Sequence, residues 1–169
     1  MTFQIGEKVV YPSYGVGTVE GISARSFGSV FENFYLLRFG SGGTTVVAPF
    51  SHAASIGLRR VTKGRAISRI LAFLSSGACA VNPDWKARFK ENSEKMRSGD
   101  LPRTAEVLKS LLRLQRERQL SFREKKMLEG ARRMLVSEIS IARQMPETFA
   151  SAVLQRALAK AGLTLPAAR

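Results

Sequence analysis

The sequence is poor in the residues that build metal and redox sites. Its 169 residues include one cysteine, Cys79, and one histidine, His52. A single cysteine cannot form an internal disulfide, and this usage is typical of a reducing compartment, so we expect a cytoplasmic protein. Cys79 and His52 are far apart in the sequence and have no acidic cluster around them, which excludes a zinc site within one chain on ligand count. We therefore predict no metal site and no cofactor.

The motifs of common catalytic sites are also missing. The sequence contains no glycine-rich phosphate loop, no paired carboxylates in an apolar setting and no nucleophile elbow. Gly15-Val16-Gly17 lacks the third glycine and the following long helix of a dinucleotide site, and we interpret its glycines as turn formers. No apolar run approaches the roughly 20 residues of a membrane span, and Met1–Lys8 lacks a signal-peptide core. We expect no catalytic residues, and neither an enzyme nor a membrane protein.

Acidic residues are scarce, and the resulting positive charge is unevenly distributed. The chain has 27 Lys and Arg residues against 13 Asp and Glu, a net charge of +14. Residues 1–62 hold five of these cations and three of the carboxylates, a net +2, which leaves +12 for residues 63–169. This second charge exceeds what solubility requires and is typical of nucleic-acid binding. The difference indicates two modules with different partners, 1–62 and 63–169.

The first module has the pattern of a small β domain. Short apolar or β-branched runs, separated by glycine and proline, predict strands at Lys8–Tyr11, Thr18–Ile22, Phe34–Phe39, Thr44–Ala48 and Leu58–Val61. Four or five short strands in about sixty residues suggest an SH3-like or Tudor-like barrel. Such a sheet often leaves an edge that can accept a strand from another protein, although the edge can equally be covered or charged.

The second module is predicted to be an all-α bundle of about five helices, which makes the whole chain α+β. Ser121 and Glu124 form a capping box, and Asp100 is placed to cap the helix that begins directly after it. Apolar residues recur at helical spacing and define the expected core: Ile67, Ile70, Leu71, Leu74, Val107, Leu108, Leu111, Leu112, Leu114, Met127, Leu128, Ala131, Leu135, Ile139, Phe149, Val153, Leu154 and Leu158. The last of these helices is predicted over residues 146–161.

The only tryptophan, Trp85, is predicted to lie in the first turn of a basic helix. Asn82 suits the N-cap and Pro83 the first helical position. Lys86, Arg88 and Lys90 follow Trp85, and Gly99 closes the helix. An exposed ring beside cations at a helix start can insert between bases while the cations bind phosphates. The alternative is that Trp85 packs in the helical core.

Several motifs, in order along residues 1–143, are similar to those of the CarD/CdnL family of bacterial transcription regulators. In the first half these are Gly6-Glu7-Lys8-Val9-Val10-Tyr11-Pro12, Gly15-Val16-Gly17, Val19-Glu20-Gly21-Ile22, Pro49 and Ile56-Gly57-Leu58-Arg59. This half also resembles the polymerase-interacting module of transcription-repair coupling factor. In the second half they are Trp85 with Arg88 and Lys90, Ser98-Gly99-Asp100, Ala105-Glu106-Val107, Leu120-Ser121 and Glu124-Lys125.

The resemblance implies a Tudor-like domain that pairs strand to strand with the β subunit of RNA polymerase. Arg25 matches a contact position, and the predicted edge with Thr45, Val46, Val47 and Pro49 would supply main-chain pairing. Val47-Ala48-Pro49 departs from the family, in which an arginine or methionine often precedes the V-P of this strand.

For the helical domain, the resemblance implies contact with promoter DNA at the upstream edge of the melted bubble. Trp85 would insert at the minor groove, and Lys86, Arg88 and Lys90 would lie beside it, with Arg88 and Lys90 on the neighbouring phosphates.

These observations favour a monomeric regulator that is tethered to polymerase and stabilises the open promoter complex with little base specificity. Two alternatives stay open. A freestanding protein that binds nucleic acid without sequence preference would place cations on the barrel and bind tightly without polymerase. A protein-only adaptor would use its surplus charge to bind an acidic partner.

Overall fold

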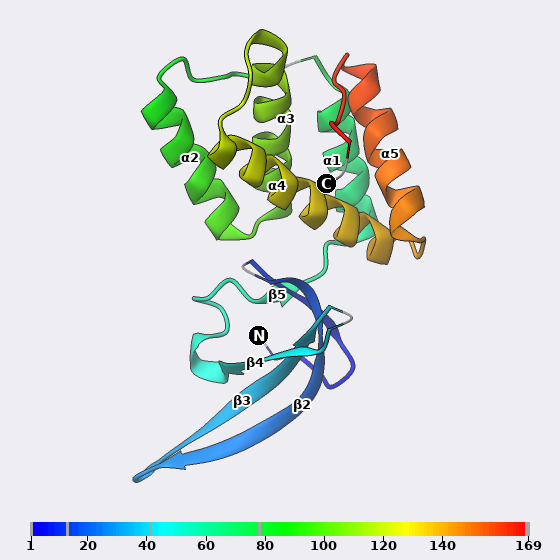
Figure 1. Cartoon of the computed structure of the whole chain (residues 1–169). Coiled ribbons are helices and arrows are strands. Elements are labelled where there is room, and N and C mark those ends of the chain that lie inside the picture. The colour runs from blue at the N-terminus through cyan, green and yellow to red at the C-terminus, as the bar shows by residue number, and fades with distance from the viewer. Residues whose placement is uncertain (1, 13, 41, 78, 168–169) are drawn as a thin grey trace. The chain divides into compact units, whose positions relative to one another are not determined.

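The computed structural model describes residues 2–12, 14–40, 42–77 and 79–167 and confirms the α+β class. The chain divides into two compact units, Met1–Val61 and Thr62–Arg169. A five-stranded antiparallel sheet forms the first unit, and five helices form the second (Figure 1). Among the described residues, no helix has the length and apolar character to cross a membrane, and no three His, Cys, Asp or Glu residues gather as a metal site.

The strands of the first unit follow one another as antiparallel neighbours, apart from the last. They are β1 Lys8–Tyr11, β2 Gly15–Phe27, β3 Val30–Phe39, β4 Thr44–Pro49 and β5 Arg59–Arg60. Their order in the sheet is β4-β3-β2-β1-β5, so β4 and β5 lie at its two edges. A short 3₁₀ helix, Phe50–His52, follows β4. The five strands agree with the small β domain expected from the sequence.

The β2–β3 hairpin is longer than the sequence pattern predicted. Pairing continues from Ile22 opposite Tyr35 to Phe27 opposite Val30, and the hairpin extends well beyond the rest of the sheet (Figure 1). Gly28 closes the turn with a φ of 63°, which suits the first position of a two-residue hairpin turn. This extension buries little, so it lacks the alternation that reveals a strand. Backbone pairing sustains it instead.

The core of the first unit lies on one face of the sheet. It is built around Val9, Val19, Tyr35 and Leu37 and is completed by Phe3, Phe39, Ala48, Ala53 and Leu58. The Tyr35 ring stacks on Phe50 with 3.9 Å between centroids, and its hydroxyl accepts a hydrogen bond from the Phe3 backbone at 3.1 Å. Gly17 lies within β2 rather than in a turn, since it pairs with Val9 on one side and Phe39 on the other, and a Cβ built there would lie 2.6 Å from the Phe39 ring.

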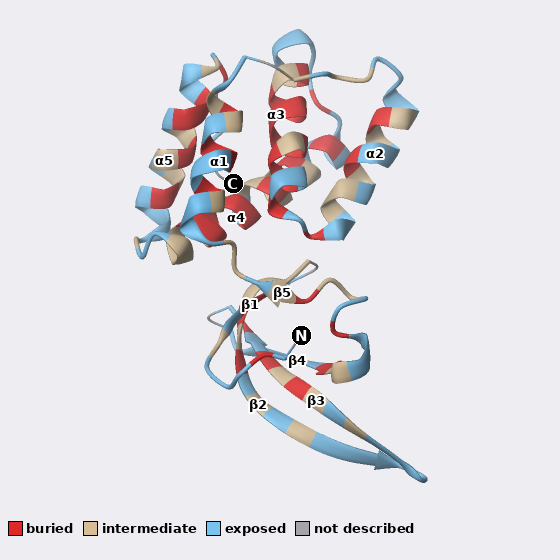
Figure 2. Ribbon diagram, turned by 180° about the vertical axis from the view of Figure 1, so that it is seen from behind, coloured by how far each residue is buried: buried red, intermediate tan, exposed pale blue. Residues whose placement is uncertain are grey.

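The helices of the second unit are α1 Gly64–Ser75, α2 Trp85–Ser98, α3 Leu101–Glu117, α4 Phe122–Ala142 and α5 Glu147–Lys160. Helix α3 packs against α1, α2 and α4, and α5 packs against α1 and α4. Figure 2 shows buried residues along α1, α3, α4 and α5. Most of these buried residues are apolar. Most predicted core residues are buried, but Met127 and Val153 are half-buried and Phe149 is 63% exposed, so the core prediction was wrong for Phe149.

Helix α2 is attached to the bundle differently from the others. Its buried residues are Arg88 and Asn92, both polar. An ion pair from Lys95 to Glu106 on α3, with 2.9 Å between Nζ and Oε2, adds a contact near its C-terminal end. Directed polar contacts therefore contribute more to the placement of α2 than an apolar stripe does.

Candidate nucleic-acid interface

Helix α2 begins at Trp85, two residues later than the sequence predicted. Asp84 is the N-cap, and its Oδ1 accepts a hydrogen bond from the Lys86 backbone at 3.1 Å. Asn82 instead accepts from the Asp84 backbone at 3.0 Å, which is the Asx turn that competes with capping. Pro83 lies inside this turn, where its fixed φ is accommodated. The N-cap prediction for Asn82 and the first-position prediction for Pro83 were therefore wrong.

Trp85 is the first residue of α2, and its side chain is exposed. It retains 64% of its accessible surface, which excludes the alternative that the ring packs in the helical core. The ammonium of Lys86 lies 5.6 Å from the ring centroid, within range of a cation–π interaction. The N-cap Asp84 places one carboxylate at the positive end of the helix dipole, and the first turn that follows it contains no further acidic residue.

The three predicted phosphate-binding cations do not lie in equivalent places. Lys86 and Lys90 are exposed one helical turn apart. Arg88 is only 6% exposed, and its Nη1 donates a hydrogen bond of 2.7 Å to the Asn82 carbonyl. Its Nη2 lies 3.7 Å from Glu124 Oε1. The structure therefore directs the Arg88 guanidinium into the protein, and only Lys86 and Lys90 of the three remain available to a ligand.

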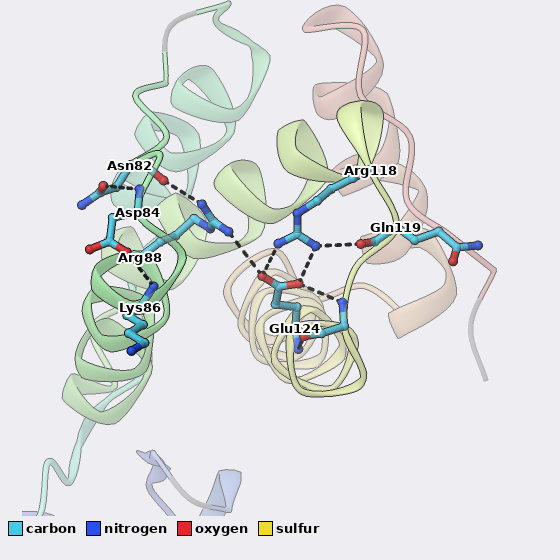
Figure 3. A network of polar contacts seen from close by, with 8 residues as sticks. Asn82, Asp84, Lys86, Arg88, Arg118, Gln119 and Glu124 are labelled. Carbon is cyan, nitrogen blue, oxygen red and sulfur yellow. Dashed lines mark hydrogen bonds and ion pairs between the residues drawn. The ribbon is translucent and has the colours of Figure 1, made fainter.

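Glu124, at the start of α4, connects Arg88 to Arg118 (Figure 3). Arg118 donates two hydrogen bonds to the Glu124 carboxylate, at 2.9 and 3.2 Å. The same carboxylate accepts from the Ser121 backbone at 2.8 Å, while the Ser121 hydroxyl accepts from the Glu124 backbone. The predicted capping box is thus confirmed, but sequence reasoning missed the role of Glu124 between helices, since a capping motif reveals only its local partner.

The electrostatics of this cluster keep Glu124 ionised. Burial acts to raise the pKa of its carboxyl, but the Arg118 hydrogen bonds and the Ser121 backbone donor outweigh it, so the pKa lies below its usual value. Two guanidinium groups therefore share one buried carboxylate, and the cluster carries a net positive charge beside the start of α2.

An open hollow of about 680 Å³ lies beside Trp85. The residues that line it are Val81, Asn82, Pro83, Trp85, Arg88, Leu114, Glu117 and Arg118. The exposed ring can stack on a nucleic-acid base, and the nearby cations can bind the phosphate backbone. The hollow beside the ring leaves room for such a ligand.

The residues predicted to contact polymerase lie on the sheet of the first unit. Strand β4 pairs with β3 and is an edge of the sheet. Residues opposite one another in a sheet share a face, and every second residue along a strand returns to it. By this rule the pairs Arg25–Glu32, Phe34–Pro49, Leu36–Val47 and Arg38–Thr45 share one face. Val46 packs on the core instead, so only its backbone is available at the edge.

Comparison with known proteins places the chain in a family. Residues 3–62 match the model of the CarD-like/TRCF RID domain, and residues 69–155 match that of the CarD C-terminal domain. The chain therefore belongs to the CarD family of transcription factors. It is 34% identical over 145 residues to a Bacillus subtilis (strain 168) protein named "Putative transcription factor YdeB", covering 86% of this chain and 95% of that protein.

Proposed function

We propose that this protein binds the β subunit of RNA polymerase through its first unit and stabilises the open promoter complex through its second. Trp85 inserts at the minor groove at the upstream edge of the bubble, and Lys86 and Lys90 bind neighbouring phosphates. The observation that carries this proposal is the exposed Trp85 ring at the first position of α2, with the exposed Lys86 and Lys90 on the same helix.

The polymerase contact rests on the geometry of β4. An edge strand presents unpaired backbone groups that can extend a partner's sheet. Arg25, Thr45, Val47 and Pro49 share the face of the sheet opposite its core, so their side chains can contact the partner beside the added strand. The near-neutral charge of residues 1–62 supports a protein partner for this unit and a nucleic-acid partner for the basic one.

The proposed mechanism is a shift in equilibrium. A ring that inserts only into opened DNA binds the open complex more tightly than the closed one, and it changes their ratio by that difference in affinity. A difference of about 1.4 kcal/mol changes the ratio tenfold. Tethering to polymerase in the cytoplasm raises the local concentration of the basic unit at the promoter, so base readout is not required.

Replacement of Trp85 by alanine tests this mechanism. We expect W85A to shorten the lifetime of the open complex by roughly tenfold, because the contact that favours opened over closed DNA is lost. Its affinity for polymerase should equal that of the parent protein. Competitor-challenge kinetics on a supercoiled promoter measure the lifetime. Phe149→Ala is the matched control, since Phe149 is equally exposed on α5. If W85A and F149A give the same lifetime as the parent, Trp85 does not stabilise the opened DNA.

A further inference from the structure

Trp85 is held by its neighbours in the chain rather than by contacts of its own ring. The indole is exposed, and among the described residues its ring makes one cation–π contact, with the Lys86 ammonium, and no aromatic contact. The residues on either side are fixed, because the Asp84 backbone donates to Asn82 and the Lys86 backbone donates to Asp84. The position of the ring therefore follows the position of the Asn82–Asp84 turn.

The Asn82–Asp84 turn is anchored by Arg88. The guanidinium of Arg88, one helical turn after Trp85, donates to the Asn82 carbonyl at 2.7 Å. The Asn82 amide also donates to Glu91 at 3.1 Å, but Glu91 is exposed. Of these two anchors the Arg88 contact is partly buried and the Glu91 contact is exposed, and a charged donor shielded from water makes the stronger hydrogen bond.

Arg88 also forms an ion pair with Glu124, which lies on another helix. Their closest atoms are 3.7 Å apart, and both side chains are almost fully buried, at 7% and 10% exposure. Glu124 is in turn oriented by two bonds from Arg118 and one from the Ser121 backbone. A chain of directed contacts thus runs from the start of α4 to the turn before Trp85 (Figure 3).

We propose that Glu124 is a positioning residue for Trp85, and that Arg88 transmits its effect instead of binding phosphate. This inference rests on the proposed function, because the ring that is positioned is the one that inserts into opened DNA. In the other helices a stripe of apolar residues fixes the helix against the bundle. In α2 the buried residues are the polar Arg88 and Asn92, and the proposal gives this polar side the same anchoring role.

Pre-organisation is the physical advantage of this arrangement. An exposed ring on a mobile turn loses conformational entropy when it inserts, and that loss subtracts from its affinity. A turn fixed by the Glu124–Arg88 contacts has already lost that freedom. Weakening the contacts should therefore reduce binding to opened DNA selectively, while binding to intact duplex, which depends on surface cations, stays the same.

Glu124→Gln is the variant of choice, because glutamine can also serve in a capping box while it removes the charge that pairs with Arg88. The matched control is Glu129→Gln on the same helix. Glu129 pairs with Arg132 at 3.0 Å, so the control makes the same change in net charge away from α2. Arg118→Gln is a second variant at an exposed partner, 43% accessible, whose loss leaves Glu124 less well oriented.

The decisive measurement uses the single tryptophan as a probe in the free protein. Time-resolved fluorescence anisotropy should show a larger fast-depolarising amplitude in E124Q, a smaller increase in R118Q, and no change in E129Q. Each variant is compared below its own unfolding transition, so that global unfolding does not contribute. An amplitude in E124Q and R118Q equal to that in E129Q would overturn the positioning role.

A second measurement separates this inference from the proposed function. Affinity for a duplex with a pre-melted bubble is divided by affinity for the matched intact duplex. We expect E124Q to lower this ratio roughly tenfold, as small misplacements of a functional group do, and E129Q to preserve it. If W85A leaves the ratio unchanged, the proposed function fails, and the anisotropy still decides whether Glu124 positions Trp85. If W85A lowers the ratio and E124Q does not, the inference fails alone.

Discussion

Individual residues in this protein carry roles that depend on what lies opposite them. Gly17 and Gly21 occupy the same strand, β2, but their surroundings differ. A Cβ on Gly17 would lie 2.6 Å from two atoms of the Phe39 ring and 2.7 Å from the Arg38 carbonyl oxygen. A Cβ on Gly21 would meet only Leu36, at an ordinary 3.5 Å. The pattern Gly15-Val16-Gly17 thus contains a glycine that begins β2 with a φ of 85°, at Gly15, and a close-packed glycine, at Gly17.

Gly17→Ala should therefore destabilise the first unit. Because the buried Phe39 ring and the backbone leave no room for a methyl group, we expect a loss of about 1–3 kcal/mol in the free energy of unfolding. Urea denaturation followed by far-UV circular dichroism measures this change. Gly21→Ala, in the same strand, should stay within about 0.5 kcal/mol of the parent. Equal stabilities for the two variants would contradict the packing argument.

At the scale of the element, the start of α4 joins a local cap to contacts between helices. The Glu124 carboxylate accepts from the backbone of Ser121 and from Arg118, and lies beside Arg88. A capping motif is readable because all its members lie within four residues. The partners from α2 and the end of α3 are not readable in that way, since they reach Glu124 only after the helices have packed.

The lowered pKa of Glu124 predicts a pH-dependent contribution to stability. A carboxyl with a lowered pKa in the folded state stabilises the protein above its unfolded pKa, near the usual 4.5 of glutamate. The contribution is lost as the pH falls through the folded value. We expect E124Q to unfold with about 1–3 kcal/mol less free energy than the parent at pH 7.

That difference should shrink as the pH falls below about 4.5. Parallel urea titrations of parent and E124Q over this pH range measure it, and subtraction removes the other titrating groups. A difference that stays constant from pH 7 to acid would show that the Glu124 charge does not contribute.

At the scale of the whole molecule, the two units differ in net charge and in the features that they expose. The first has a net charge of +2 and an edge strand, and the second has +12 and an exposed tryptophan. Backbone pairing at an edge strand specifies a protein partner, while surplus cations bind nucleic acid in a salt-dependent way. If the units act as proposed, changes in each should affect different steps.

Arg25→Glu should reduce recovery of the protein on immobilised polymerase β subunit by at least roughly tenfold, because a like or unpaired charge at an interface is costly. Because Arg25 is exposed, we expect R25E to fold normally, so that lower recovery reports weaker binding and not unfolding. Binding of R25E to bubble DNA alone should remain within about twofold of the parent.

Arg103→Glu on α3 is the control, with the same change in charge at an exposed position of the second unit. It should bind the β subunit normally. Normal binding by R25E as well would remove the proposed role of this sheet face. A parent protein that binds bubble DNA tightly but fails to bind the β subunit would favour the freestanding nucleic-acid-binding alternative.

The sequence by itself determined the features that depend on neighbours along the chain. Glycine and proline punctuation located the strands, helical spacing located most of the core, and the Ser121–Glu124 motif marked a helix start. Composition alone separated a near-neutral part from a basic one. Local rules suffice for these features because backbone geometry and periodic burial act over a few residues.

Only the tertiary structure decided which side chains face outward and which are engaged within the protein. Trp85 and Arg88 stand three residues apart in one basic helix, yet one is exposed and the other is buried against Asn82 and Glu124. The extension of the β2–β3 hairpin and the close approach at Gly17 were decided in the same way. Burial and pairing depend on residues distant in sequence, and their directions are set only when the elements pack.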